Sequence, residues 1–235
     1  MCKSVDKGIY SLGLNDKLDL IEKIEDGSIG REDGINLLSI LAKDEESEVR
    51  LRVSEILISF NSDGKMEELL FSLTYDKDYL VRASACDSIS GLNNPQSISI
   101  LEKVLEKDKS KMVKAYAALS LSEVCWSLEN SINSSIAIIK DKLVNESNSW
   151  VKIFYYAALY RLGVKEYLNY LIVDLNSNSY RTRCAVVNLV KDLILDDLIE
   201  DIESISLTLK DRILKEDSTA VISSINKVLE LIDQT

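Results

Sequence analysis

Apolar residues recur along this chain with a helical period, and the register of that period returns six times. Each copy starts at an anchor residue, which is apolar in most copies and is usually followed by a basic residue. The anchor residues are Val49, Val81, Val113, Val151, Thr182 and Val221. Further apolar residues stand four, eight and eleven positions after each anchor, as Ala85, Ile89 and Leu92 do in the second copy. Because these offsets share one face of an α-helix, each copy predicts a helix with one buried stripe.

A second apolar helical segment precedes the anchor-bearing helix in every copy. These preceding segments cover residues 35–43, 66–74, 98–105, 136–143, 167–175 and 198–214. Polar turn residues punctuate the pairs, and no stretch alternates between apolar and polar residues for long enough to form a strand. The pattern therefore predicts an all-α protein, a right-handed α-solenoid of about six stacked helical hairpins with a period of roughly 34 residues.

A shorter helix is expected ahead of the repeats. Apolar residues fall three positions apart between residues 16 and 25, and three glycines then interrupt the pattern. We therefore expect residues 1–30 to form a lead-in with one short amphipathic helix, and residues 31–235 to form the repeat domain.

The chain of 235 residues carries a formal net charge of −11. Such a charge repels phosphate backbones and anionic lipid, so it argues against binding to nucleic acid or membranes. The longest apolar run, residues 153–160, is far shorter than the roughly 20 residues that a membrane-spanning helix needs. The first residues also lack the apolar core of a signal peptide. These features predict a cytoplasmic protein, a monomer or weak oligomer, with a basic protein as the favoured partner.

Residue types that catalysis usually requires are missing. The chain contains no histidine, which excludes the serine–histidine and cysteine–histidine arrangements of nucleophilic enzymes. Its cysteines are too far apart for a Cys-x-x-Cys pair, and no glycine-rich phosphate loop is present. We therefore expect no enzymatic activity, no cofactor and no metal site, and we expect the cysteines within the apolar patterns to be buried free thiols. These are Cys86, Cys125 and Cys184.

The repeated register resembles the HEAT-repeat superfamily, in particular its short bacterial variety, the lyase-type HEAT-like repeats. The resemblance covers about residues 31–233 and is carried by the basic residue after the anchor and by an acidic residue five positions before it. The acidic residues are Asp44, Asp76, Asp108, Glu146 and Glu216. Later copies depart from the pattern, since Ser177 replaces the acidic residue in the fifth copy and the sixth copy lacks the basic one. The last copy is therefore expected to be a cap with a solvated outer face.

The acidic and basic columns admit a catalytic reading and a structural one. We favour the structural reading, because a feature present in nearly every copy is a property of the fold rather than of one site. Each acidic side chain is placed to cap the N-terminus of the anchor-bearing helix, and each basic side chain is placed to bridge to the neighbouring turn.

Aromatic residues are concentrated between positions 150 and 180. In HEAT-like stacks the second helix of each hairpin lines the concave face, so the resemblance implies that Tyr156 and Tyr160 point into a groove beside Lys152. Amphipathic aromatic residues beside a cation are common anchors of protein interfaces. Packing of the same tyrosines against neighbouring helices is the alternative. Arg183, from the basic column, completes this first group of candidate binding residues.

Acidic residues are concentrated between positions 192 and 217, a segment with nine acidic and only three basic residues. A solvated terminal face explains such a segment, and a docking surface for a basic protein is the alternative, because clustered charge speeds association and selects partners. The candidate binding residues of this segment are Asp196, Asp197, Glu200 and Asp201.

These observations favour a non-catalytic protein-binding module. Small acidic HEAT-like proteins resemble, among others, bacterial immunity proteins that neutralise a basic toxin. One alternative is a lyase-type or chaperone helper that holds a cofactor-bearing partner, which would need a groove for a planar ligand with an accessible cysteine in it. A second alternative, a nucleic-acid-processing protein of the DNA glycosylase kind, would need a positively charged groove, and the acidic composition disfavours it.

Overall fold

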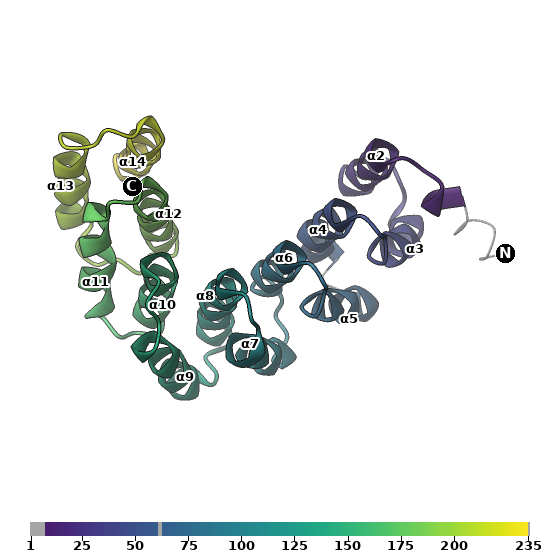
Figure 1. The fold of residues 1–235 in the computed structure, drawn as a ribbon, viewed down its shortest axis with the longest axis horizontal. Helices are drawn as coiled ribbons and strands as arrows, with labels where there is room; N and C mark the ends of the chain where they lie inside the picture. Colours follow the sequence, from purple (N-terminus) through teal and green to yellow (C-terminus); the bar gives the residue numbers. More distant parts are fainter. Residues whose placement is uncertain (1–7, 61–62, 235) are drawn as a thin grey trace. The chain divides into compact units, whose positions relative to one another are not determined.

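The computed structural model describes residues 8–60 and 63–234 of the chain, and within these residues the secondary structure is helical, without strands. Figure 1 shows the helices following one another as a series of hairpins. Their bounds are α2 Leu14–Glu25, α3 Arg31–Leu41, α4 Ser47–Ile56, α5 Gly64–Leu73, α6 Tyr79–Ile89, α7 Gln96–Lys107, α8 Lys111–Leu128, α9 Ile132–Val144, α10 Ser149–Arg161, α11 Tyr167–Val173, α12 Tyr180–Leu195, α13 Ile202–Ile213 and α14 Thr219–Ile232. Short 3₁₀ turns, η1 Leu57–Phe60 and η2 Asp174–Asn176, extend α4 and α11. This element order confirms the predicted all-α fold of the α-solenoid class.

The chain divides into two compact units, one ending at Leu128 and the other beginning at Glu129. In the first unit the anchor-bearing helices α4, α6 and α8 pack in series, and α2 packs against α4 at the start of that row. We call these four helices, α2, α4, α6 and α8, the second-helix row. The partner helices α3, α5 and α7 lie beside them as the other arms of the hairpins (Figure 1). In the second unit α10, α12 and α14 pack in series in the same way.

The predicted apolar stripes form the cores of both units. Side chains four, eight and eleven positions after the anchor are buried in the first five copies, from Val53 in α4 to Leu193 in α12. In the sixth copy Ile225 is buried, whereas Leu229 and Ile232 remain half-exposed. The half-exposed pair is what a terminal hairpin with no further repeat to cover it should show.

Ion pairs connect consecutive hairpin turns, as the acidic and basic columns predict. Arg50 Nε donates a hydrogen bond to Asp76 Oδ2 at 2.7 Å, and Arg82 Nε donates to Asp108 Oδ2 at 2.6 Å. Lys17, in α2, makes the equivalent pair with Asp44 at 2.7 Å. The guanidinium groups also donate to backbone carbonyl oxygens of their own hairpin turns, so each arginine ties two turns together.

The acidic residue of each turn also accepts a hydrogen bond from the backbone N–H two residues later. Asp76 Oδ1 accepts from Asp78 N at 2.8 Å, and Asp108 Oδ1 accepts from Ser110 N at 2.7 Å. Burial alone would raise the pKa of Asp76, but hydrogen bonds from Arg50 and from this backbone N–H outweigh burial, so the pKa is lowered. The ion pairs between turns agree with a structural role for the columns. The predicted capping is wrong for α6, because its N-cap is Asp78, whose own side chain accepts from the first turn of the helix, while Asp76 accepts from the backbone N–H of Asp78.

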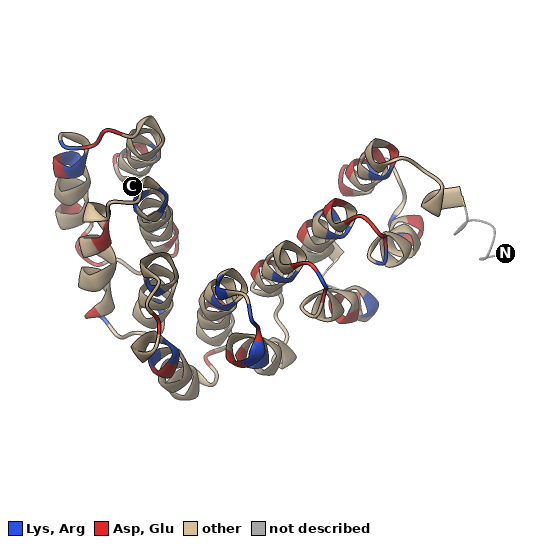
Figure 2. Ribbon diagram, in the orientation of Figure 1, with Lys and Arg blue, Asp and Glu red and all other residues tan. Residues whose placement is uncertain are grey.

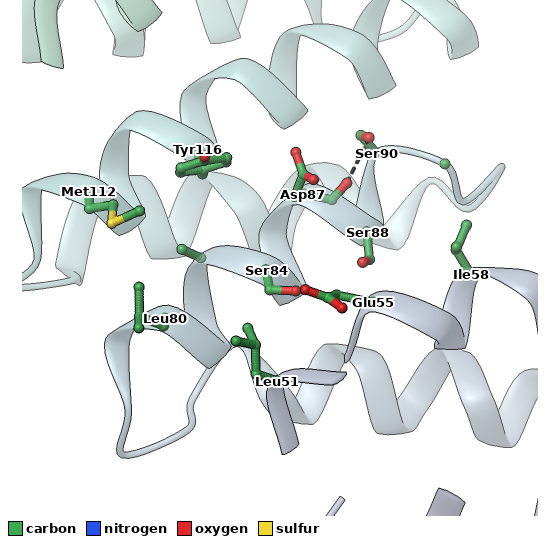
Figure 3. Close-up of a pocket in the computed structure, with 12 residues that line it drawn as sticks. Leu51, Glu55, Ile58, Leu80, Ser84, Asp87, Ser88, Ser90, Met112 and Tyr116 are labelled. Carbon is green, nitrogen blue, oxygen red and sulfur yellow. Dashed lines mark hydrogen bonds between the residues drawn. The ribbon is translucent and has the colours of Figure 1, made fainter. Parts of the chain in front are cut away.

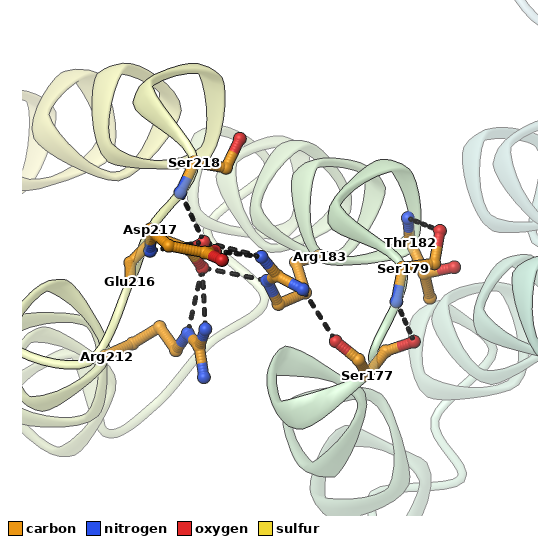
Figure 4. Close-up of polar contacts among 8 residues, drawn as sticks. All are labelled: Ser177, Ser179, Thr182, Arg183, Arg212, Glu216, Asp217 and Ser218. Carbon is orange, nitrogen blue, oxygen red and sulfur yellow. Dashed lines mark hydrogen bonds and ion pairs between the residues drawn. The ribbon is translucent and has the colours of Figure 1, made fainter.

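The last turn of the second unit holds the most buried of these pairs. Figure 4 shows Glu216 between two guanidinium groups, with Arg183 at 2.5 Å and Arg212 at 2.8 Å. Glu216 Oε1 also accepts from Ser218 N at 2.9 Å, and its side chain is fully buried. Because the hydrogen bond from Arg183 favours the charged form, the pKa of Glu216 lies far below its usual range. Ser177, which replaces the acidic residue one copy earlier, accepts from Arg183 through its backbone carbonyl.

Candidate functional site

A groove runs along the second-helix row of the first unit, over α4, α6 and α8. Its volume is about 490 Å³. Apolar side chains form much of its lining, and serines and two carboxylates complete it (Figure 3). The lining residues are Leu51, Glu55, Ile58, Leu80, Ala83, Ser84, Asp87, Ser88, Ser90, Gly91, Met112 and Tyr116. We call this surface the apolar groove.

The register of the repeats explains why these side chains meet. Those one position before the anchor and two, three and six positions after it share a helical face that points away from the buried stripe. In α6 these positions hold Leu80, Ala83, Ser84 and Asp87, all of which line the apolar groove. Stacking of consecutive anchor-bearing helices then places equivalent positions side by side, so the groove follows directly from the repeat.

Close helix packing gives one end of the apolar groove its wall. A Cβ atom added to Gly91 would lie 2.7 Å from Ile58 Cδ1, which is closer than real Cβ contacts come. Because this atom belongs to the side chain of Ile58, the lack of a side chain at Gly91 leaves room for Ile58 in the lining of the groove.

A second hollow adjoins the apolar groove between α2 and α4. Leu51 and Glu55 line both surfaces, so the two are contiguous. The residues of the second hollow are Leu18, Asp19, Glu22, Glu25, Glu48, Leu51, Arg52 and Glu55. Five of its eight lining residues are carboxylates and one is a guanidinium, and Figure 2 shows acidic residues on both α2 and α4. We call this surface the acidic hollow.

Arg52 lines the acidic hollow and is the one basic side chain among the residues named for the two surfaces. Its guanidinium contacts Glu25 on α2 and donates a hydrogen bond to Glu55 Oε2 on its own helix at 2.9 Å. The hydrogen bond with Glu55 raises the pKa of Arg52, so the side chain is charged at every pH of interest. Since Arg52 and both partners are partly exposed, the bridge adds little to stability and remains open to replacement.

The structure places Tyr160 differently from the prediction. Its side chain is only 4% exposed, and its hydroxyl donates a hydrogen bond to the backbone carbonyl of Leu198 at 3.0 Å. Lys165 covers the ring at 5.1 Å from its centroid. The implied orientation of Tyr160 into a groove is therefore wrong, because this ring packs within the second unit.

Tyr156 also packs toward the outer arm of its hairpin. Its ring stacks on Tyr167 of α11 at 5.9 Å between centroids and lies 5.6 Å from that of Tyr170. Tyr156 stands five positions after its anchor, and in the first unit the residues at that position, Ser54 and Cys86 among them, are fully buried. The register thus directs this position at the neighbouring helices, so packing is the outcome for Tyr156, and only Tyr170 of this cluster is largely exposed.

Replacing Tyr160 with phenylalanine should lower the free energy of unfolding of the second unit by about 1 kcal/mol, the usual net value of one buried hydrogen bond. The change removes only the hydroxyl that donates to Leu198. Urea denaturation followed by circular dichroism would measure it. Tyr170→Phe is the matched control, since that residue is 54% exposed, and should leave stability within about 0.5 kcal/mol. Equal effects of the two variants would contradict the assigned role of the hydroxyl.

The remaining predicted binding residues of the second unit have partners within the fold. Arg183 is buried in the ion-pair cluster with Glu216, and Lys152 is half-buried on α10 near Asp174. Asp196 pairs with Arg161 at 2.8 Å, and Glu200 pairs with Lys165 at 3.1 Å.

Two further carboxylates of this segment lie at turns. Asp201 caps α13 by accepting a hydrogen bond from Ser204 N at 2.9 Å. Asp197 is exposed, with a backbone φ of 55°, at the end of α12. The structure thus accounts for much of the acidic segment through local contacts, and its role in binding a partner stays a prediction.

None of the cysteines in the described part of the chain lines either surface of the first unit. Cys86 and Cys125 are buried, and burial raises the pKa of Cys86 strongly. Cys184, in α12, is half-buried, and burial raises its pKa as well. Both shifts oppose formation of the reactive thiolate.

The described residues, 8–60 and 63–234, contain no cluster of three or more acidic or cysteine side chains placed to hold a metal ion. No helix in this part of the chain has the length and apolar character that crossing a membrane requires.

Comparison with known proteins agrees with this repeat architecture. Residues 36–122 match the family model for HEAT repeats. The matched HEAT repeats run from within α3 to within α8, and they carry every residue that lines the apolar groove. No curated protein matches the sequence.

A solved structure extends the comparison over almost the whole chain. It is the complex of CpcE and CpcF of phycocyanin lyase from Nostoc sp. PCC7120. The similarity has a TM-score of 0.59 at 14% sequence identity, and it covers 99% of this chain and 95% of that one. At this identity the likeness is one of fold.

Proposed function

We propose that this protein is a helper that binds another protein and works in complex with it, using the apolar groove and the acidic hollow as its binding surface. The observation that carries the proposal is a groove with apolar lining residues left open along the second-helix row. Hydrophobic side chains such as Leu80 are costly to leave in water unless a partner covers them. The similarity to the structure of a complex of two proteins, CpcE and CpcF of phycocyanin lyase, supports association with another protein.

The chemistry of the surface supports holding rather than covalent catalysis. A groove of about 490 Å³ could accept a planar group carried by a partner. The second requirement of that reading, an accessible cysteine, is not met among residues 8–60 and 63–128 of the first unit, where Cys86 and Cys125 are buried. We therefore propose a helper of the lyase-associated or chaperone kind that binds its partner non-covalently.

The charge of the surface favours a basic partner. The two surfaces together hold six carboxylates and one guanidinium, so they attract cations and repel phosphate backbones. The arginines of the basic column are engaged in ion pairs at the hairpin turns, as Arg50 and Arg82 show, and do not line these surfaces. This arrangement opposes the nucleic-acid alternative. Neither comparison offers support for an immunity protein, and the helper reading takes its place.

The proposal predicts that carboxylates placed in the apolar groove will weaken partner binding. Leu80 and Met112 are accessible side chains of the groove, so the double variant Leu80→Glu/Met112→Glu should fold and yet weaken binding at least about tenfold, as for the loss of buried interface anchors. The tagged chain would be used to capture partners from source-cell extract. Each captured protein would then be purified and its affinity measured by calorimetry.

The matched control is Leu207→Glu/Leu214→Glu, which adds the same two charges at exposed positions at and just after α13. It should bind the purified partner with unchanged affinity. If no purified protein binds, or if the groove variant binds as tightly as the control, the proposed function is wrong.

A further inference from the structure

The binding surface changes character from one helix to the next along the second-helix row. At the position before the anchor, α4 carries Glu48, α6 carries Leu80 and α8 carries Met112. Three positions after the anchor, the same helices carry Arg52, Ser84 and Tyr116. Charged residues thus give way to apolar and aromatic ones from α2 and α4 toward α8.

The two halves of the surface are continuous, so one ligand can contact both. Leu51 and Glu55 line the apolar groove and the acidic hollow alike. Packed helices lie about 8–10 Å apart, so three steps from α2 to α8 span roughly 24–30 Å. A helical segment of about 18 residues has this length at 1.5 Å per residue.

Arg52 already occupies the acidic hollow as an internal cation. Its guanidinium joins Glu25 of α2 to Glu55 of α4, at the place where a cationic side chain of a partner would be attracted most strongly. The remaining carboxylates of the hollow, Glu22 and Glu48 among them, are exposed and leave the local charge negative. Arg52 and a basic ligand therefore compete for the same carboxylates.

We propose that the partner binds through a bipartite segment, with a block of apolar residues over α6 and α8 and a block of basic residues over α2 and α4, and that Arg52 weakens this binding by occupying the acidic hollow. The inference rests on the proposed function, because it names the chemistry of the segment that the binding surface receives. The inference fixes the direction in which one substitution changes the affinity. Removal of a positively charged surface residue should strengthen binding of the segment.

Synthetic peptides test the bipartite chemistry without knowledge of the natural partner. The probe is a fluorescein-labelled helical peptide of about 18 residues, with leucine and tryptophan in one half and arginine in the other. An isomer of identical composition, with apolar and basic residues interspersed, is the first control. Fluorescence anisotropy with the full-length protein would give the affinity of each, at low and at high salt.

The blocked peptide should bind roughly tenfold more tightly than the interspersed isomer, since only the former places both blocks over matching surfaces. Arg52→Gln should strengthen its binding roughly threefold, and Glu22→Gln/Glu48→Gln should weaken it by a similar factor, in the range of partly exposed ion pairs. Two exposed changes on α13 are the controls. Lys210→Gln removes a positive charge, as Arg52→Gln does, and Glu203→Gln removes a negative charge, as the glutamate variants do. Both lie outside the surface and should leave the affinity unchanged.

The inference is overturned if neither peptide binds, if both bind equally, or if Arg52→Gln weakens binding. These results can be told apart from failure of the proposed function. In the distinguishing case, binding of a captured protein depends on Leu80 and Met112, while its affinity is unchanged by Arg52→Gln and by salt. That result would support the proposed function and contradict the basic block of the bipartite segment.

Discussion

Glu216→Gln should destabilise the terminal hairpin of the second unit, α13 and α14, by about 3 kcal/mol. Removing one member of a buried ion pair leaves the other charge uncompensated, and such losses are typically about 3–5 kcal/mol. Here two guanidinium groups, from Arg183 and Arg212, would lose a fully buried partner. Asp217, 3.1 Å from Arg183 and exposed, retains some of the compensation, which sets the expectation at the lower end.

Hydrogen exchange followed by mass spectrometry would measure this loss element by element. Faster exchange should be confined mostly to α13, α14 and the turn before α12, where Arg183 also holds the carbonyl of Ser177. Glu203→Gln, an exposed change on the same hairpin, is the control and should leave exchange unaltered. Exchange that is equally fast in both variants, or that rises first in the other unit, would contradict the role assigned to Glu216.

The same carboxylate should make the second unit sensitive to acid. Because the pKa of Glu216 is lowered in the folded state, its contribution is fully present above the ordinary glutamate pKa of about 4.3 and is lost as pH falls below that value. The midpoint temperature of thermal unfolding of the wild type should therefore decrease below about pH 4. The Glu216→Gln variant should show a shallower fall over this range. A variant with the same acid slope as the wild type would show that this group does not drive the transition.

Leu121→Ala should lower the free energy of unfolding of the first unit by about 2–5 kcal/mol, the range for emptying a buried leucine site. Leu121 is fully buried in α8, the helix that packs against both α6 and α7. The cavity would therefore be shared by three helices whose backbones cannot easily collapse into it. Urea denaturation monitored by circular dichroism, with hydrogen exchange to assign the loss to α6–α8, would measure the effect.

Trp126→Ala is the matched control for Leu121→Ala. Trp126 lies on the same helix but is 48% exposed near its C-terminal end, so its removal should cost much less than that of the smaller, buried leucine. If the tryptophan variant were the less stable of the two, the assignment of the core to the repeated stripe would be wrong.

Much of the fold could be predicted because the same pattern of apolar and charged residues recurs in six copies. The offsets of four, eight and eleven mark the stripe that is buried, and the acidic and basic columns mark the turns that ion pairs connect. The helix caps come from other residues, such as Asp78 of α6. The terminal cap was also expected, because the sixth copy lacks the basic residue, and Leu229 and Ile232 of its stripe are half-exposed in the structure. Periodicity works here because each helix meets the same neighbours as the helix before it.

The candidate site was harder to predict, because aromatic and acidic composition pointed to the second unit. Tyr160 has the residue type of an interface anchor, but its hydroxyl donates a hydrogen bond to the backbone carbonyl of Leu198 within the fold. Tyr156 stood at a position that the register directs toward the outer helices. The burial of Ser54 and Cys86 at the same offset in other copies agrees with this placement.

The groove itself left a signal in the sequence at positions outside the stripe. Leu80 and Met112, one position before their anchors, are apolar residues on a face that should be solvated. What one sequence does not give is the distance between α2 and α4, which decides that Glu25, Arg52 and Glu55 meet. Side-chain contacts between separate helices depend on packing, and packing is fixed only in three dimensions.

The central claim is that the second-helix row of the first unit receives a protein partner. Hydrogen exchange of the full chain, with and without the captured and purified partner, tests it most directly. The account predicts slower exchange in α2, α4, α6 and α8 on binding, with little change around Tyr170 and Asp201. Protection confined to the second unit would contradict the claim and would indicate that the aromatic cluster or the acidic segment there binds the partner.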